Sequence, residues 1–258
     1  MLSKNQKKLI ASMAQKKQRD SHGLFLAEGP KTVTDLLEAG LQATLIAHTI
    51  NWSLPPSCHT ESLQLIPVTQ KELESASHLK TPQHVLALFK QPHYSINNNA
   101  IYNELTLVLD GIQDPGNMGT IIRLADWFGI HQIVCSLDTV DVFNPKVVQA
   151  TMGAIARIKV HYTDLPAFLQ QYREKCANPI YGTYLEGKNI YDNPLIAPSL
   201  IVMGNEGNGI RAENTPFITQ KLTIPTFPAG TPTSESLNVG VAAAIVCAEF
   251  RRVAAYSR

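Results

Sequence analysis

Two glycine-rich turns in this sequence carry polar side chains whose types and spacing could do chemistry. The first turn follows the apolar run Leu107–Leu109 and leads to Asn117 and Arg123. We expect a helix to begin near Gly119, with Asn117 in the loop and Arg123 about one helical turn into the helix. An arginine there can hold a phosphate through two parallel N–H donors. An ordinary strand, turn and helix with a surface arginine is the alternative, and the spacing alone leaves it open.

The second turn follows the apolar run Leu200–Met203 and holds Gly204, Gly207 and Gly209 around Glu206. Three glycines in six residues permit positive φ angles and a close approach of the backbone to a ligand. The glycine order differs from that of the dinucleotide-binding loop, and a carboxylate inside the loop would repel a pyrophosphate. A nucleotide-dependent oxidoreductase is therefore disfavoured, whereas a tight turn without a ligand stays possible.

A third segment runs from Leu222–Pro225 through an irregular loop to the small, apolar stretch Ser236–Phe250. This stretch predicts a helix that packs closely against a neighbour. Ser236 or Ser234 is a plausible N-cap, and Asn238 would lie in the first turn, near the loop. Read alone, the segment favours a buried helix with a serine cap.

The elements that must position these side chains follow from the apolar pattern. Apolar runs alternate with helical patterns after residue 100, which predicts an α/β fold with a mostly parallel sheet flanked by helices. Such sheets bind ligands at the carboxyl ends of their strands. The predicted strands are Leu105–Leu109, Gln132–Ser136, Ile180–Tyr184 and Leu200–Met203.

The first ninety residues predict a separate, small α/β unit. Lys4–Arg19 hold six basic residues and no acid, with Leu2, Leu9, Ile10 and Met13 at roughly helical spacing. We expect one amphipathic helix, either bound to RNA or merely solvated. The asparagine-rich stretch after Gln91 is the best linker candidate. The predicted division is 1–92, an RNA-binding domain; 93–102, a linker; and 103–258. The candidate RNA contacts are Lys7, Lys8, Lys16 and Lys17.

Composition sets the outer limits. The chain has 258 residues and a formal net charge of only +1, so any RNA surface must be a local patch. It has no run of eighteen apolar residues, and its lysine-rich start is unlike a secretory signal. The four cysteines form no CxxC pair, and Cys135 and Cys247 lie in apolar segments. We expect a reduced, cytoplasmic protein with no membrane association and no zinc site.

The three segments, in this order, resemble the three motifs of the SpoU (TrmH-type) RNA methyltransferases of the SPOUT superfamily. The resemblance covers about residues 105–252. Residues 1–92 also look like that family's small substrate-binding domain, through Gly23–Lys31 and Thr81–Ala87. The matching motif segments are Asn117–Arg123, Met203–Ile210, and Ile224–Pro225 with Ser236–Ile245.

The resemblance implies a carboxyl-terminal trefoil knot, S-adenosylmethionine as cofactor without a metal, and a homodimer. The implied reaction is methyl transfer to a ribose 2′-hydroxyl in RNA. By the same resemblance Arg123 is the catalytic arginine. The other implied positions are Asn117, Glu206, Ser236 and Asn238 in the active site, and Gly204, Ile224 and Leu237 at the cofactor.

The RNA target is indicated less directly than the reaction. A separate amino-terminal domain resembles the rRNA-modifying members, so we expect large-subunit rRNA, with tRNA as the alternative. A non-catalytic RNA-binding protein that kept the fold would have lost Arg123 or the Glu206 loop, and both are present. An arginine base is awkward because its pKa is so high, which favours an orienting and electrostatic role for Arg123.

Two positions depart from the family pattern. The family usually has serine where this chain has Gly240, which puts a role for that hydroxyl in doubt. The loop Thr226–Glu235 is longer than usual and holds Pro228 and Pro232. We expect it to reshape the RNA entrance.

Overall fold

The computed structural model describes residues 1–56, 58, 63–228 and 234–256. They form two compact units, each described here by itself. Unit 1 is Met1–His93 with Asp141–Arg157, and unit 2 is Tyr94–Val140 with Ile158–Arg258. Within the described ranges, no helix is both long and apolar enough to cross a membrane. The predicted entrance loop Thr226–Glu235 lies partly outside the described residues, and its Pro232 lies entirely outside them.

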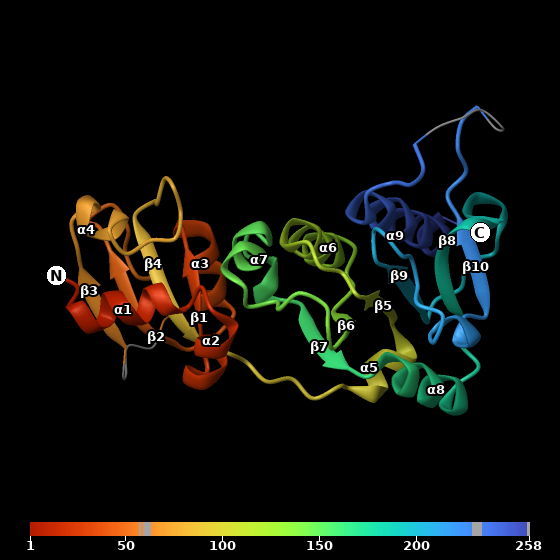
Figure 1. Ribbon diagram of the computed structural model, residues 1–258, viewed down its shortest axis with the longest axis horizontal. Coiled ribbons are helices and arrows are strands. Elements are labelled where there is room, and N and C mark those ends of the chain that lie inside the picture. Colours follow the sequence, from red (N-terminus) through yellow and green to blue (C-terminus); the bar gives the residue numbers. More distant parts are fainter. Residues whose placement is uncertain (57, 59–62, 229–233, 257–258) are drawn as a thin grey trace. The chain divides into compact units, whose positions relative to one another are not determined.

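Unit 1 is built on a four-stranded sheet in the order β1-β4-β2-β3 (Figure 1). β2 pairs with β3 in parallel, and the other two pairings are antiparallel. Helices α1 and α4 cover one face, where Ile10, Met13 and Leu73 pack on Leu26 and Leu88. The bounds are β1 Leu24–Glu28, β2 Ala43–His48, β3 Gln64–Pro67, β4 Val85–Lys90, α1 Lys4–Ser12, α3 Pro30–Glu38 and α4 Gln70–Glu74.

The single basic helix predicted over Lys4–Arg19 is wrong. α1 ends at Ser12, and α2 (Lys16–His22) is a separate helix. The break is held by Arg19, whose Nη1 donates to the carbonyl oxygens of Met13 at 2.8 Å and Ala14 at 3.1 Å. Arg19 is 1 % exposed and also pairs with Asp141. One of the six basic residues is therefore part of the interior of unit 1.

A segment from the second half of the sequence packs in unit 1. α7 (Pro145–Ala150) is capped by Asn144, and the ring of Phe143 packs on that of Phe25 in a tilted arrangement, with 4.8 Å between the ring centroids. Gly153 has a φ of +93° and leaves no room for a Cβ beside Asp35. Unit 1 thus draws on two stretches of the chain. The predicted boundaries at 92 and 103 describe sequence order and stay a prediction.

Unit 2 contains a six-stranded sheet in the order β10-β8-β9-β5-β6-β7, in which every neighbouring pair is parallel. α5 and α8 pack on one face, and α6 and α9 lie on the other (Figure 1). The four predicted strands are confirmed, whereas β7 and β10 were not predicted. The bounds are β5 Leu105–Asp110, β6 Gln132–Ser136, β7 Lys159–Thr163, β8 Ile180–Asn189, β9 Ser199–Gly204, β10 Gln220–Thr223, α5 Asn98–Asn103, α6 Pro115–Trp127, α8 Leu165–Lys175 and α9 Val239–Tyr256.

Candidate active site

The first motif lies on a helix that begins earlier than the sequence predicted. α6 starts at Pro115, not near Gly119, and Asp114 is its N-cap. The Oδ1 of Asp114 accepts a hydrogen bond from the backbone N–H of Asn117 at 2.8 Å. Aspartate followed by proline is a strong helix start, because the carboxylate caps a free N–H and proline needs no partner. Asn117 is therefore in the first helical turn, and Arg123 lies two turns along.

Side chains from all three motifs meet in one hydrogen-bonded chain. The Nδ2 of Asn117 donates to Oε1 of Glu206 at 2.5 Å. The Nδ2 of Asn238 donates to Oδ1 of Asn117 at 2.9 Å. The structure thus places Asn117, Glu206 and Asn238 together at the carboxyl edge of the sheet, the edge at which parallel sheets bind ligands.

Asn238, and not a serine, caps α9. Its Oδ1 accepts hydrogen bonds from the backbone N–H groups of Gly240 at 2.9 Å and Val241 at 3.3 Å. The predicted cap by Ser236 or Ser234 is wrong, because Asn238 stands directly before the helix and its amide oxygen reaches the first free N–H groups. Ser236 is exposed, and its hydroxyl has no hydrogen bond to any residue that the structure describes.

α6 and α9 run parallel, with their amino ends at this polar chain. A Cβ on Gly240 would lie 3.1 Å from Cγ2 of Thr120, near the start of both helices. At the other end, Nε of Arg251 donates to the carbonyl oxygen of Phe128 at 2.6 Å. Two helix N-termini, each with partial positive charge, therefore converge where the Glu206 carboxylate sits.

The second motif folds into a closed loop. Asn205 and Gly209 exchange two backbone hydrogen bonds of 3.0 and 2.9 Å. The Asn205 side chain accepts from the N–H of Gly207 at 2.8 Å and donates to the carbonyl oxygen of Gly111 at 2.7 Å. A Cβ on Gly204 would collide with the backbone of residues 209 and 210, so only glycine fits there. Sequence reasoning missed Asn205, which ties this loop to the turn after β5.

An ion pair between the buried Asp110 and Arg211 holds the same edge of the sheet. Asp110, the last residue of β5, is fully buried and accepts from the N–H of Arg211 at 2.9 Å and from Asn214 at 2.8 Å. Nε of Arg211 donates to its other oxygen at 2.5 Å, and the guanidinium also reaches Asp138 at 3.2 Å. Partial burial lowers the pKa of Arg211, but bonding to Asp110 outweighs this and raises it. Bonding to Ser136, and then the charge of Arg211, lowers the pKa of Asp138.

Arg123 stands apart from this network. It is exposed on the face of α6 that also carries Thr120 and Trp127, spaced by three and four residues. Its guanidinium has no hydrogen bond or ion pair with any described residue. All its donors are therefore free for an anionic ligand, as the catalytic prediction requires.

The predicted cofactor positions lie along the same edge. Gly204 ends β9 and Ile224 follows β10, while Leu237 directly precedes Asn238 and is 48 % exposed. Glycine backbone groups, partly exposed apolar side chains and one carboxylate suit an adenosyl group that carries a cationic sulfur. Among the described residues, no group of three His, Cys, Asp or Glu side chains is placed to hold a metal.

The four predicted RNA-binding lysines differ in their surroundings within unit 1. Lys7 donates to Oγ of Ser75 at 2.9 Å, and Lys16 pairs with Asp20 at 2.8 Å. Lys8 and Lys17 are exposed and have no polar partner among the described residues. The two free lysines are the ones available to phosphates.

Comparison with known proteins gives a consistent assignment over both units. Residues 104–248 match the SpoU rRNA Methylase family, and residues 4–87 match the MRM3-like substrate binding domain. A Bacillus subtilis relative, the 23S rRNA (guanosine(2553)-2′-O)-methyltransferase RlmP, is 29 % identical over 251 residues, covering 96 % of this chain and 97 % of its own length.

Solved structures agree over nearly the whole chain. An RNA methyltransferase of the TrmH family from Porphyromonas gingivalis superposes with a TM-score of 0.88 and 38 % identity, covering 98 % of this chain and 99 % of its own. An AdoMet-bound rRNA methyltransferase from Sinorhizobium meliloti superposes with a TM-score of 0.83 and 26 % identity, covering 98 % and 97 %. The chain therefore belongs to the SpoU rRNA methylase family, as its three motifs predicted, and is an S-adenosylmethionine-dependent RNA 2′-O-ribose methyltransferase.

Proposed function

We propose that the chain methylates a ribose 2′-hydroxyl in large-subunit ribosomal RNA. The observation that carries the proposal is the chain of bonds from Glu206 through Asn117 to Asn238, with the unpartnered Arg123 on the same helix as Asn117. The Bacillus subtilis relative acts on 23S rRNA and matches both units, which supports rRNA over tRNA.

In this proposal the Arg123 guanidinium holds the phosphate beside the target ribose. Its planar fork offers two parallel donors, which fix the direction of the phosphate as well as its position. The 2′-hydroxyl oxygen attacks the methyl carbon that the bound cofactor would supply, and its proton passes to solvent water. A positive charge near the developing negative oxygen stabilises that transition state. Ser236, whose hydroxyl is free, donates to the ribose or its phosphate.

The three networked side chains act by positioning. Asn117 and Asn238 fix the amino ends of α6 and α9, and Glu206 fixes the loop that follows β9. Gly204, Ile224 and Leu237 hold the cofactor, which supplies a methyl group on a positively charged sulfur. Alignment of nucleophile, methyl carbon and sulfur accounts for several kcal/mol of the barrier. Methyl transfer from a sulfonium would release a neutral thioether, which needs no Lewis acid to depart, so we propose a reaction that uses no metal.

The finer properties implied by the family belong to the same proposal. We propose a homodimer formed through α6 and α9, because Trp127 is 84 %, Val241 50 % and Tyr256 79 % exposed on these two helices. Sedimentation at micromolar concentration should show a dimer, and a monomer would count against this. We also propose the trefoil knot and a cytoplasmic location, which suits cysteines that form no disulfide in the described part of the chain.

Ribose methylation mapped across total RNA tests the proposed function. A strain that lacks the gene should lose a methyl group at one site in large-subunit rRNA. The wild-type gene should restore it, and a gene encoding Arg123→Ala should not. Loss of a tRNA methyl group instead would select the tRNA alternative. An unchanged map would favour a non-catalytic RNA-binding protein.

A further inference from the structure

Unit 1 contains a groove that methyl transfer does not use. A cavity of about 700 Å³ opens beside α1, at the end of the sheet where β1, β2 and β3 begin and β4 ends. Leu9 and three strand leucines form an apolar floor, and polar side chains form the walls. The floor is Leu9, Leu24, Leu45 and Leu88, and the walls include Asn5, His22, Gln64, Lys90, Gln91 and His93.

The wall side chains keep hydrogen-bonding groups free. Asn5, His22 and His93 have no side-chain hydrogen bond to any residue in the described part of the chain. Gln64 accepts from Gln6 at 2.9 Å through its oxygen, which leaves its amide N–H groups free. Gln91 donates to the carbonyl oxygen of Leu24 at 3.1 Å, which leaves its own oxygen free. The groove therefore presents donors and acceptors side by side.

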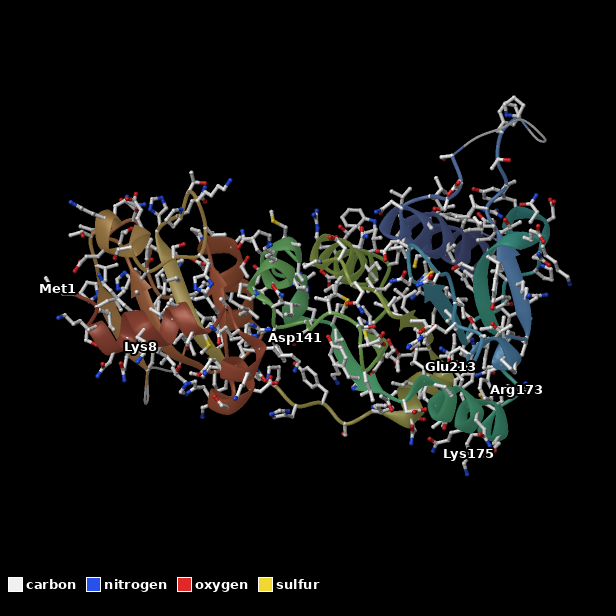
Figure 2. The ribbon with its side chains drawn as sticks, viewed as in Figure 1. Met1, Lys8, Asp141, Arg173, Lys175 and Glu213 are labelled. Carbon is white, nitrogen blue, oxygen red and sulfur yellow. The ribbon has the colours of Figure 1, made fainter. Side chains whose placement is uncertain are left out.

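The charge around the groove favours an anion. None of the described lining residues is acidic, and Lys90 uses only one N–H, to Gln42 at 3.0 Å. Lys8, labelled on α1 in Figure 2, follows Asn5 by three residues and is thus its neighbour on the helix surface. No acidic residue precedes Asp20 in the sequence.

This combination matches one ligand chemistry. A nucleobase has two apolar faces and an edge of alternating donors and acceptors, which asparagine and glutamine amides pair with. In paired RNA these edges are hidden, so base-reading proteins take nucleotides from loops, bulges and ends. The cavity volume falls in the range of ordinary ligand pockets. A peptide partner would not need the cationic rim together with so many free amides.

We propose that this groove binds an unpaired nucleotide of the substrate RNA. The base lies against Leu9 and Leu24, the two partly exposed leucines of the floor. The edge of the base contacts Asn5, Gln64, Gln91 and His93. Lys8 and Lys90 contact the adjoining phosphates. The inference takes the RNA substrate from the proposed function. It adds that an unpaired nucleotide, held outside the methyl-transfer site, selects that substrate.

Fluorescence anisotropy with the full chain tests the proposal. The probes are labelled ten-nucleotide oligo(A) and oligo(U) and a fully paired RNA of equal length. The single strands should bind more tightly than the duplex. Asn5→Ala with His93→Ala should weaken single-strand binding about tenfold at an unchanged salt slope, since neutral contacts release no counterions. Lys90→Gln should instead reduce the slope by about one.

Two further variants guard against a trivial loss of fold. Asn5→Asp places a carboxylate in the groove, yet an acid in the first turn stabilises a helix, so α1 is kept. It should weaken single-strand binding as the double variant does. The matched control is Asn51→Ala with His78→Ala, two exposed side chains of unit 1 outside the groove. This control should bind as the wild type does.

The proposal is overturned if duplex and single strands bind alike, or if the groove variants lose no more affinity than the control. It is also overturned if the loss for Asn5→Ala with His93→Ala comes with a flatter salt slope, because the contacts would then be to phosphates alone. Binding is measured without methyl transfer. A protein that methylates no RNA but loses single-strand affinity in the groove variants would refute the proposed function and support the groove.

Discussion

Two sheet ends in this molecule carry amide side chains, and they use them in opposite ways. In unit 2, Asn117 bonds to both Glu206 and Asn238, and the amide oxygen of Asn238 accepts from the N–H of Gly240, so both amides are occupied within the protein. In unit 1, the amide of Asn5 has no partner in the described structure, and the amide of Gln64 uses only its oxygen. An amide at the edge of a sheet therefore does not by itself mark a ligand contact. Occupied amides hold loops in place, and free ones are available to a ligand.

The same substitution, asparagine to aspartate, should have different effects at the two sheet ends. Asn117→Asp brings a second carboxylate within 2.5 Å of Glu206 in a network that has no cation to offset it. The repulsion should separate the Glu206 loop from the start of α6 and lower single-turnover methylation at least about 100-fold, with weaker cofactor binding. Asn5→Asp should leave cofactor affinity unchanged and weaken only RNA binding. If both variants changed cofactor affinity equally, the proposed difference between the occupied amides of unit 2 and the free amide of Asn5 would be wrong.

The second prediction concerns the buried pair of Asp110 and Arg211, which supports the carboxyl edge of the sheet in unit 2. Asp110→Ala removes a buried carboxylate that satisfies Arg211 twice and Asn214 once. Breaking such a pair leaves donors without partners and should lower the free energy of unfolding by about 3 kcal/mol. Urea denaturation measures it. Lys16→Ala, which removes an exposed pair in unit 1, should cost less than about 1 kcal/mol. Similar losses would mean that the buried pair is not the anchor.

The smallest predicted effect concerns Gly240, the position at which the family usually has serine. In Gly240→Ser the new Cβ would lie 3.1 Å from Cγ2 of Thr120, so the helices must shift slightly at a cost of about 1 kcal/mol. Adding Thr120→Ser removes that methyl group and should restore part of the melting temperature, because Oδ1 of Asn238 also lies 3.2 Å from the new Cβ. Methylation by the double variant should match the wild type, because Asn238 already caps α9. A large gain in turnover would show that the family hydroxyl has a role that this chain lacks.

The motif order and the strands that lead into the site could be predicted from the sequence, because apolar runs and glycine-rich turns are local signals. The helix starts were mispredicted, although Asp114-Pro115 and Asn238 before Val239 were visible cap signals. Other contacts left no local signal. Asp110 and Arg211 are 101 residues apart, and the packing of Phe143 on Phe25 in unit 1 depends on tertiary structure. No spacing rule reaches such pairs.

The occupied and free groups also explain why Arg123 is singled out in unit 2. It is exposed and unpartnered beside a network in which Asn117, Glu206 and Asn238 satisfy one another. We therefore assign the transition-state contact to Arg123 and positioning to the other three. Lysine at this position would keep the charge but lose the planar fork.

Single-turnover methylation with saturating large-subunit rRNA tests this assignment most directly. Wild type, Arg123→Lys and Arg123→Ala are compared, with cofactor affinity titrated on the same preparations. We expect cofactor affinity near that of the wild type for both variants and a methylation rate lowered at least about 100-fold, because the contact matters mostly in the transition state. If Arg123→Ala methylates at the wild-type rate, Arg123 is a surface residue and the assigned catalytic centre is wrong.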